Sequence, residues 1–142
     1  MYRTRQVRIK KGNRLRDYCG KACMDSATLY NRANFIIRQY ATACRDWDLM
    51  KPLTKNQMEV WHMVRLVTRG TKHFPGRRWL TYRQLDYILK ETKDPAYRAL
   101  PAQANQQILK RIIRDYKSFF ESMKGYKDHP DRFTGRPKLP GY

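Results

Sequence analysis

The chain has 142 residues and a formal net charge of +19, from 31 Lys and Arg against 12 Asp and Glu. Cations spread over a whole chain at this density are typical of nucleic-acid binding, although a ribosome-like or merely solubilising surface has the same composition. Hydrophobic residues at 41% exclude a disordered basic tail, the length excludes a second full domain, and no apolar run approaches the roughly 18 residues of a membrane span.

The cysteines indicate the compartment more than a site. Cys19, Cys23 and Cys44 are odd in number and no apolar signal segment opens the sequence, so we expect a reduced cytosol or nucleoid of a prokaryote. Cys19 and Cys23 would share a helix face, but a zinc site needs about four ligands and no second Cys or His pair has a matching spacing. We therefore predict small core side chains and no metal.

Residues 1–13 are predicted to form a strand that ends in a turn. Val7 and Ile9 alternate with Arg8 and Lys10, so the two kinds of side chain would face opposite sides of an extended segment. Gly12 and Asn13 then favour a turn.

Two helices are predicted next. From about residue 14 to 45, small and apolar residues recur at spacings of three and four, which is the helical period. Gly20 favours a start or a bend near it, because glycine costs about 1 kcal/mol relative to alanine in a helix interior. After Pro52, a second helix is predicted from Thr54 to about Arg69.

The segment between Glu59 and Asp86 contains no acid. Gly70, Pro75 and Gly76 predict a loop in its middle, where Phe74 and Trp79 interleave with cations that include Arg77 and Arg78. Such a mixture suits a backbone track with surfaces on which bases stack. The alternative is a solvated loop that Trp79 anchors to the core.

Two further helices are predicted before the end of the sequence. Thr81 and Gln84 form a capping-box pattern that opens a short helix to about Glu91, and Asp94-Pro95 restarts the chain in another short turn. The last helix is predicted from Pro101, in the first helical position, to a stop at Gly125. Its cations are open to two interpretations, a solvated face or contacts with phosphates.

The order of short segments along the chain resembles the amino-terminal half of TnpB, a transposon-encoded RNA-guided DNA endonuclease related to the type V CRISPR effectors. No single tetrapeptide is diagnostic, but the order and spacing cover nearly the whole chain, whereas residues 46–79 are longer and more basic than in many relatives. The segments are Leu29-Tyr30-Asn31, Ala33-Asn34, Ile36-Ile37-Arg38-Gln39, Leu80-Thr81-Tyr82, Leu100-Pro101-Ala102-Gln103, Lys117-Ser118-Phe119-Phe120 and Gly135-Arg136-Pro137-Lys138.

The resemblance implies a mainly α fold, with a helical recognition lobe inserted after the first strand of an incomplete wedge-type β-barrel. Residues 1–13 would be that strand, 14–125 the lobe, and 126–142 the linker that returns to the wedge domain. The twelve acids are dispersed along the chain, so we expect no catalytic residue in it. Magnesium and zinc are implied only for a missing or separate nuclease half, and no cofactor is expected here.

The resemblance also implies the partners and the binding residues. The partners would be guide RNA, target DNA and a nuclease half in the same chain or a separate subunit, with no membrane. The family points to Tyr82 and Gln106, with Gln103 close by, as readers of a short target-adjacent DNA motif, since amides pair with adenine; the alternative is that these amides cap the helix and bind water. Contacts with the RNA or heteroduplex backbone are predicted for Arg3, Arg5, Arg8, Lys10, Lys11, Arg77, Arg78, Lys110, Arg111, Arg114 and Lys117.

Two other functions are compatible with the sequence. One is a standalone regulator that binds RNA or DNA and blocks access without cutting. The other is a structural RNA-binding protein of ribosomal type.

Overall fold

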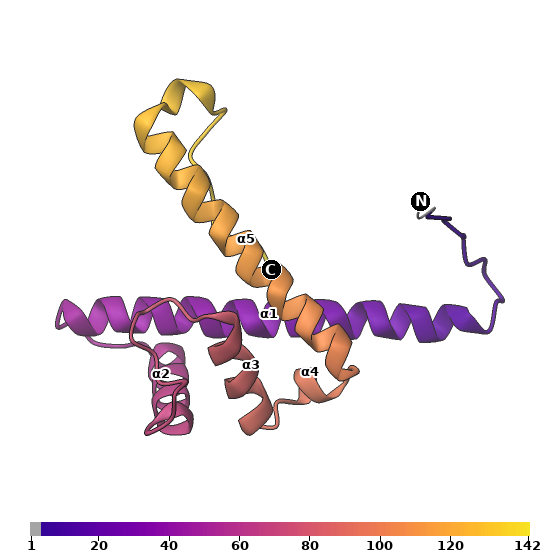
Figure 1. The fold of residues 1–142 in the computed structure, drawn as a ribbon, viewed down its shortest axis with the longest axis horizontal. Coiled ribbons are helices and arrows are strands. Elements are labelled where there is room, and N and C mark those ends of the chain that lie inside the picture. Colours follow the sequence, from indigo (N-terminus) through magenta and orange to yellow (C-terminus); the bar gives the residue numbers. More distant parts are fainter. Residues whose placement is uncertain (1–3) are drawn as a thin grey trace.

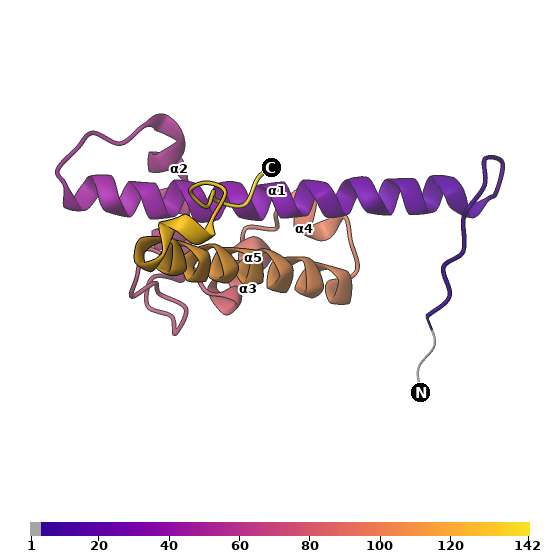
Figure 2. The same cartoon turned by 90° about the horizontal axis from the view of Figure 1, so that it is seen from above.

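The computed structural model describes residues 4–142, and over that range the chain is all α-helical. A long first helix forms a spine, the last helix crosses it obliquely, and the three shorter helices lie below the spine in this view (Figure 1). Figure 2 shows from above that the third and last helices lie on the same side of the spine. The elements are α1 (Leu15–Asp48), α2 (Lys55–Thr68), α3 (Tyr82–Glu91), α4 (Pro95–Arg98), α5 (Ala102–Asp128) and the 3-10 turn η1 (Pro130–Arg132).

The mainly α fold is confirmed, but the strand predicted for residues 1–13 is wrong over the part that the structure describes. Residues 4–10 have no regular secondary structure, and the predicted turn follows at Gly12, where φ is +91°. A strand needs a neighbour to pair its N–H and C=O groups, and residues 4–142 contain no other strand to supply one.

The core is built around the middle of α1. Its fully buried side chains include Leu29, Ile36 and Tyr40, which meet Val64 of α2 and Leu109 of α5 in one cluster. Each large apolar side chain buried in this way contributes about 1.5–3 kcal/mol. The guanidinium of Arg32 adds an ion pair with Asp94 at 2.8 Å, which ties α1 to the start of α4.

The first third of α1 projects beyond this core (Figure 1). The helix begins at Leu15, as its apolar period predicts, and runs through Gly20 without interruption, so the alternative start near Gly20 is wrong. The apolar period continues through this part, yet Tyr18 is 70% exposed and Met24 is 72% exposed, because no other element within residues 4–142 covers them. The core prediction for the cysteines fails for the same reason, since Cys23 is exposed and Cys19 is only half-buried.

The segment after η1 returns along α5 to the middle of α1 (Figure 1). Buried Asn34 donates hydrogen bonds from Nδ2 to the carbonyl oxygens of Pro140 at 3.2 Å and Gly141 at 3.0 Å. The guanidinium of Arg38 also donates to the Pro140 carbonyl and lies 4.8 Å from the ring centroid of Tyr142. Arg38 therefore belongs to the internal packing and not to a free cationic edge of α1.

The capping predictions hold at two helix starts. Thr54 and Gln57 open α2 with a reciprocal capping box, and Thr81 and Gln84 open α3 in the same way. The stop predicted at Gly125 is wrong, because α5 continues to Asp128. Gly125 lies within the helix and faces the ring of Phe133, where a Cβ would be in ordinary van der Waals contact at 3.4 Å.

Candidate nucleic-acid interface

One face of α5 carries both amides and cations. The opposite side of the helix is buried through Asn105, Leu109, Ile112 and Tyr116, which fixes the rotation of α5 about its own axis. Gln106 is half-buried and the other members of the face are exposed. At 3.6 residues per turn, five predicted binding residues fall within an arc of about 80°: Gln103, Gln106, Lys110, Arg114 and Lys117.

A hollow of about 630 Å³ lies between this helix and the start of α3. It brings together Tyr82, Arg77 and Lys117, three of the residues predicted to bind nucleic acid, although they are far apart in the sequence. Its wall is mainly apolar and is formed by Ile37, Arg77, Trp79, Leu80, Thr81, Tyr82, Ile113, Tyr116, Lys117 and Phe120.

Tyr82 is held at the junction of α3 and α5. The capping box of Thr81 and Gln84 makes Tyr82 the first residue of α3. The ammonium of Lys110 lies 5.5 Å from the centroid of the Tyr82 ring, within the range of a cation–π contact. Burial, and then the nearby charge of Asp86, raises the pKa of the Tyr82 phenol, so the hydroxyl remains a donor near neutral pH.

The amides at the start of α5 differ in what they do. Asn105 donates from Nδ2 to the carbonyl oxygen of Leu100 at 3.2 Å, and so holds the turn that precedes the helix. Among the hydrogen bonds of residues 4–142, none uses the side chain of Gln103 or Gln106, and α5 begins without a side-chain cap. Neither of these two amides therefore caps the start of α5 in the described range, whereas Asn105 binds the carbonyl just before it.

The two neighbouring arginines of the loop are separated by the fold. Arg77 lines the hollow beside α3, whereas Arg78 lines a smaller one of about 260 Å³ on the side of α1. Trp79 lines both hollows. The centroid of its ring lies 4.8 Å from that of Phe120 and 5.7 Å from that of Tyr116. Trp79 thus anchors the loop to the core, as the second interpretation of this segment predicted.

The remaining predicted cations lie elsewhere. Arg5, Arg8, Lys10 and Lys11 are exposed in the segment before α1, at the end of α1 that lies away from α2 (Figure 1). Arg3 lies outside the described residues. Arg111 is exposed on α5 and close enough to Tyr30 for its charge to oppose the rise in the pKa of that phenol. The structure therefore groups the α3–α5 residues and leaves the amino-terminal cations apart.

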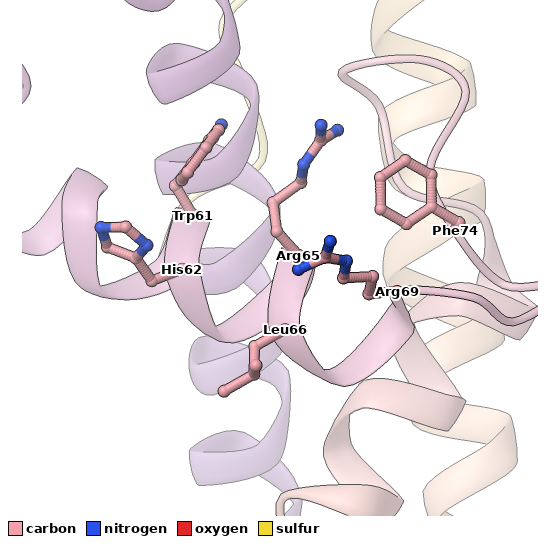
Figure 3. A pocket seen from close by; sticks show the side chains of 6 residues that line it. All are labelled: Trp61, His62, Arg65, Leu66, Arg69 and Phe74. Carbon is pink, nitrogen blue, oxygen red and sulfur yellow. The ribbon is translucent and has the colours of Figure 1, made fainter.

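A cluster on α2 was missed by sequence reasoning (Figure 3). The guanidinium of Arg65 lies 4.4 Å from the ring centroid of Phe74 and 5.4 Å from that of Trp61. The ring of Trp61 also stacks on the ring of Trp47, with centroids 5.1 Å apart and an interplanar angle of 20°. The spacing of four between Trp61 and Arg65 was the available signal, since it places both on one face of a helix.

Within residues 4–142, no three His, Cys, Asp or Glu side chains come together in a way that would hold a metal ion. None of the helices there combines the length and apolar character needed to cross a bilayer. No family model, curated protein or solved structure matches the chain.

Proposed function

We propose that this chain is the guide-RNA and target-DNA binding lobe of a TnpB-like RNA-guided DNA endonuclease, working with a nuclease half that supplies the catalytic carboxylates. In such systems, base pairing reads the long target, while the protein reads a short adjacent motif and holds the heteroduplex by its backbone. The observation that carries the proposal is the α3–α5 face, defined as Tyr82, Gln103, Gln106, Lys110, Arg114 and Lys117.

The charge of this face supports a polyanionic partner. The ion pairs within residues 4–142 use the cations of Lys21, Arg32 and Arg45, and none belongs to the α3–α5 face. Uncompensated cations along one helix face bind phosphates in sequence-independent fashion, with release of counterions.

The arrangement of amides before cations supports two roles on one helix. Gln103 and Gln106 lie in the first turns of α5, and Lys110 follows Gln106 by four residues on the same face. Glutamine amides pair with base edges, chiefly with adenine, and discriminate by about 1–3 kcal/mol per good contact. We therefore assign motif reading to the start of α5 with Tyr82, and backbone binding to the cations of its later turns.

A binding titration tests the backbone role. The triple variant Lys110→Ala, Arg114→Ala and Lys117→Ala should lose affinity for an RNA–DNA heteroduplex about equally for all sequences. A matched variant that removes the same charge from exposed positions elsewhere, Lys55→Ala, Lys90→Ala and Arg98→Ala, should bind much more tightly than the triple variant. Equal losses in the two variants would show that only net charge matters and would overturn the assignment to this face.

A second titration tests the reading of bases. DNA ligands for Gln106→Ala and Tyr82→Ala would carry either the preferred motif, selected from a randomised duplex library with the wild-type chain, or a scrambled one. Both variants should lose the preference while they retain affinity for the scrambled duplex. Equal losses on both duplexes would remove the base-reading role and leave the phosphate role intact.

The identity of the bound RNA tests the guide itself. RNA that copurifies through moderate salt should be one defined species, whereas bulk ribosomal RNA would contradict the proposal in favour of a ribosomal protein. A reading frame downstream of the gene that resumes with barrel strands and later dispersed Asp and Glu residues would support the nuclease partnership.

A further inference from the structure

A row of stacked groups crosses the surface formed by the end of α1, α2 and the following loop. Its order is Trp47, Trp61, Arg65 and Phe74, with successive separations of 5.1, 5.4 and 4.4 Å. We call these four residues the aromatic row. Three of its members come from different segments of the chain, so the folded core and not the local sequence brings them together.

The two ends of the aromatic row are open. Trp47 is 59% exposed and Phe74 is 38% exposed, while Trp61 and Arg65 between them are half-buried. A hollow lies at each end: one of about 530 Å³ beside Trp47 and Lys51, and one of about 420 Å³ beside Arg65, Arg69 and Phe74. Each therefore combines an aromatic ring with a cation, and each is of a size that holds a small ligand.

The guanidinium of Arg65 is fixed in place. The rings of Trp61 and Phe74 hold its two faces, and it is near enough to the Tyr40 hydroxyl to oppose the rise in pKa that burial causes there. Figure 3 shows Arg65, in the last turn of α2, and Arg69, the residue that follows the helix, beside Phe74. Among residues 4–142, neither guanidinium forms an ion pair.

This combination matches one chemical class of ligand. Exposed rings stack on nucleobases, at about 1–3 kcal/mol per base, and paired guanidinia bind a phosphate. A base can stack on these rings only when its own face is uncovered, so a fully paired duplex does not satisfy the site. Three carboxylates belong to these segments: Asp46 and Asp48, which flank Trp47 at the end of α1, and Glu59 on α2. Asp46 is paired with Arg45.

The position of the aromatic row relative to the α3–α5 face is also informative. The hollow beside Phe74 and the hollow beside Tyr82 share no residue, yet Phe74 and Arg77 belong to the same loop. Three residues of chain span at most about 10 Å. A strand that leaves a duplex at the α3–α5 face therefore has a short path to the aromatic row.

We infer that the aromatic row, together with Arg69, is a second binding site, for an unpaired segment of nucleic-acid strand. A backbone phosphate lies on Arg65 and Arg69, one base stacks on the free ring face of Phe74, and another base, farther along the strand, stacks on Trp47. This inference rests on the proposed function for the class of ligand, but it assigns a site and a strand state that the α3–α5 face does not provide.

The test uses fluorescein-labelled oligoadenylate of about 12 nucleotides, within the usual range of site sizes, as RNA and as DNA, beside a heteroduplex of the same length. Phe74→Ala and Trp47→Ala should each weaken single-strand binding about tenfold, because each removes one stacked base. Both should leave heteroduplex affinity unchanged. Arg65→Lys should also weaken single-strand binding, since lysine keeps the charge and loses the planar stack.

Phe74→Leu is the matched control for packing, because it keeps an apolar side chain in the loop and removes the stacking face. It should bind single strands as weakly as Phe74→Ala. A direct readout comes from tryptophan fluorescence, which bound bases should quench in the wild type and less in Trp47→Phe. The RNA and DNA arms show whether the 2′-hydroxyl contributes.

The outcomes separate the two proposals. If the wild type binds heteroduplex but shows no single-strand binding, or if Phe74→Ala and Trp47→Ala bind single strands as the wild type does, the second site is overturned while the α3–α5 face stands. The triple variant of α5 should lose the heteroduplex and keep the single strand. Failure of the wild type to bind either ligand would overturn both proposals.

Discussion

The Tyr116 hydroxyl donates a hydrogen bond to Oδ1 of Asn34, with the two oxygens 2.6 Å apart and both side chains buried. This bond joins the middle of α5 to the middle of α1 at the point where the helices cross. The amide nitrogen of Asn34 simultaneously holds the carbonyl oxygens of Pro140 and Gly141. A single buried asparagine thus connects three segments that are distant in the sequence.

Replacement of this asparagine should be costly. Asn34→Ala leaves the buried Tyr116 hydroxyl without its acceptor, and a buried group without a partner costs about 1–3 kcal/mol. It also removes the hydrogen bonds to the carbonyl oxygens of Pro140 and Gly141, of which Pro140 keeps the one from Arg38, and it leaves a cavity in the core. We expect the free energy of unfolding, measured by urea denaturation, to fall by at least about 2 kcal/mol. Tyr116→Phe should cost less, because it leaves only the Asn34 oxygen without its partner. A fall below about 0.5 kcal/mol for Asn34→Ala would show that water replaces these bonds.

Much of the helix pattern was predictable because it depends on local chemistry. The capping box of Thr81 and Gln84 satisfies amides within one turn, and the spacing of apolar residues defines the buried side of α5. Whether a segment finds a partner is a tertiary property. Val7 and Ile9 alternate as a strand would but meet no second strand in the described range, and Cys23 follows the apolar period but lies where nothing covers it.

The candidate site was also predictable only where it depends on a single helix. Gln106, Lys110 and Lys117 lie on one face because the helical period places them there. The proximity of Tyr82 to Lys110 depends on how α3 packs on α5, and the stacking of Trp47 on Trp61 depends on how α1 meets α2. Such contacts between elements have no signal in the spacing of either segment.

The alkaline limit of stability should be set by three phenols, of Tyr40, which is buried, and of Tyr30 and Tyr97, which are half-buried. The Tyr30 hydroxyl donates to Oδ2 of Asp115 at 2.8 Å, and burial, followed by that bond, raises the pKa of Tyr30 to about 12. Tyr40 and Tyr97 are raised to about 12 as well, again chiefly by burial. In the unfolded chain these phenols ionise near pH 10, so the stability they contribute is complete below pH 10 and is lost as the pH rises towards about 12.

Urea midpoints should therefore decline steadily between pH 10 and about 12, and Tyr30→Phe should decline less steeply than the wild type. Ultraviolet titration of the folded protein should show some of its 10 tyrosines ionising only as it unfolds. Ionisation of all of them in a single step near pH 10, with the fold intact, would contradict the burial of Tyr30, Tyr40 and Tyr97.

The cap of α3 should matter for both stability and motif preference. Thr81→Ala removes the hydrogen bond that the backbone N–H of Gln84 donates to the Thr81 hydroxyl oxygen, at 3.3 Å, and should cost about 1 kcal/mol. Because Tyr82 is the next residue, the variant should also blunt discrimination of the target-adjacent motif. Thr54→Ala removes the equivalent cap of α2 and is the matched control. It should lose similar stability and keep the motif preference, and a loss of preference in both variants would assign the effect to stability alone.

The projecting part of α1 should exchange its amide hydrogens quickly. In the part of the chain that the structure describes, no other element covers residues 15–27, and an isolated helix of this length is marginal in water. We expect hydrogen exchange there to be much faster than in residues 29–44 of the same helix. Gly20→Ala should slow it, since a Cβ at this position meets no atom within 4 Å and alanine gains about 1 kcal/mol of helix propensity. Equal protection along the whole of α1 would indicate that the free protein covers this segment, for example by self-association.

The salt dependence of binding should report how many cations of α5 meet phosphates. Each phosphate that a lysine or arginine neutralises adds about 0.9 to the slope of log affinity against log salt concentration on duplex DNA. Lys117→Ala and Arg114→Ala should therefore each reduce that slope by about 1 on any sequence. Gln106→Ala should leave the slope unchanged, because a neutral amide releases no counterion, and this distinguishes a reader of bases from a binder of backbone on the same helix face. If Lys117→Ala lowers affinity at every salt concentration by the same factor, the ammonium is not in contact with phosphate, and its place in the hollow beside Tyr82 would instead serve packing through its aliphatic stem.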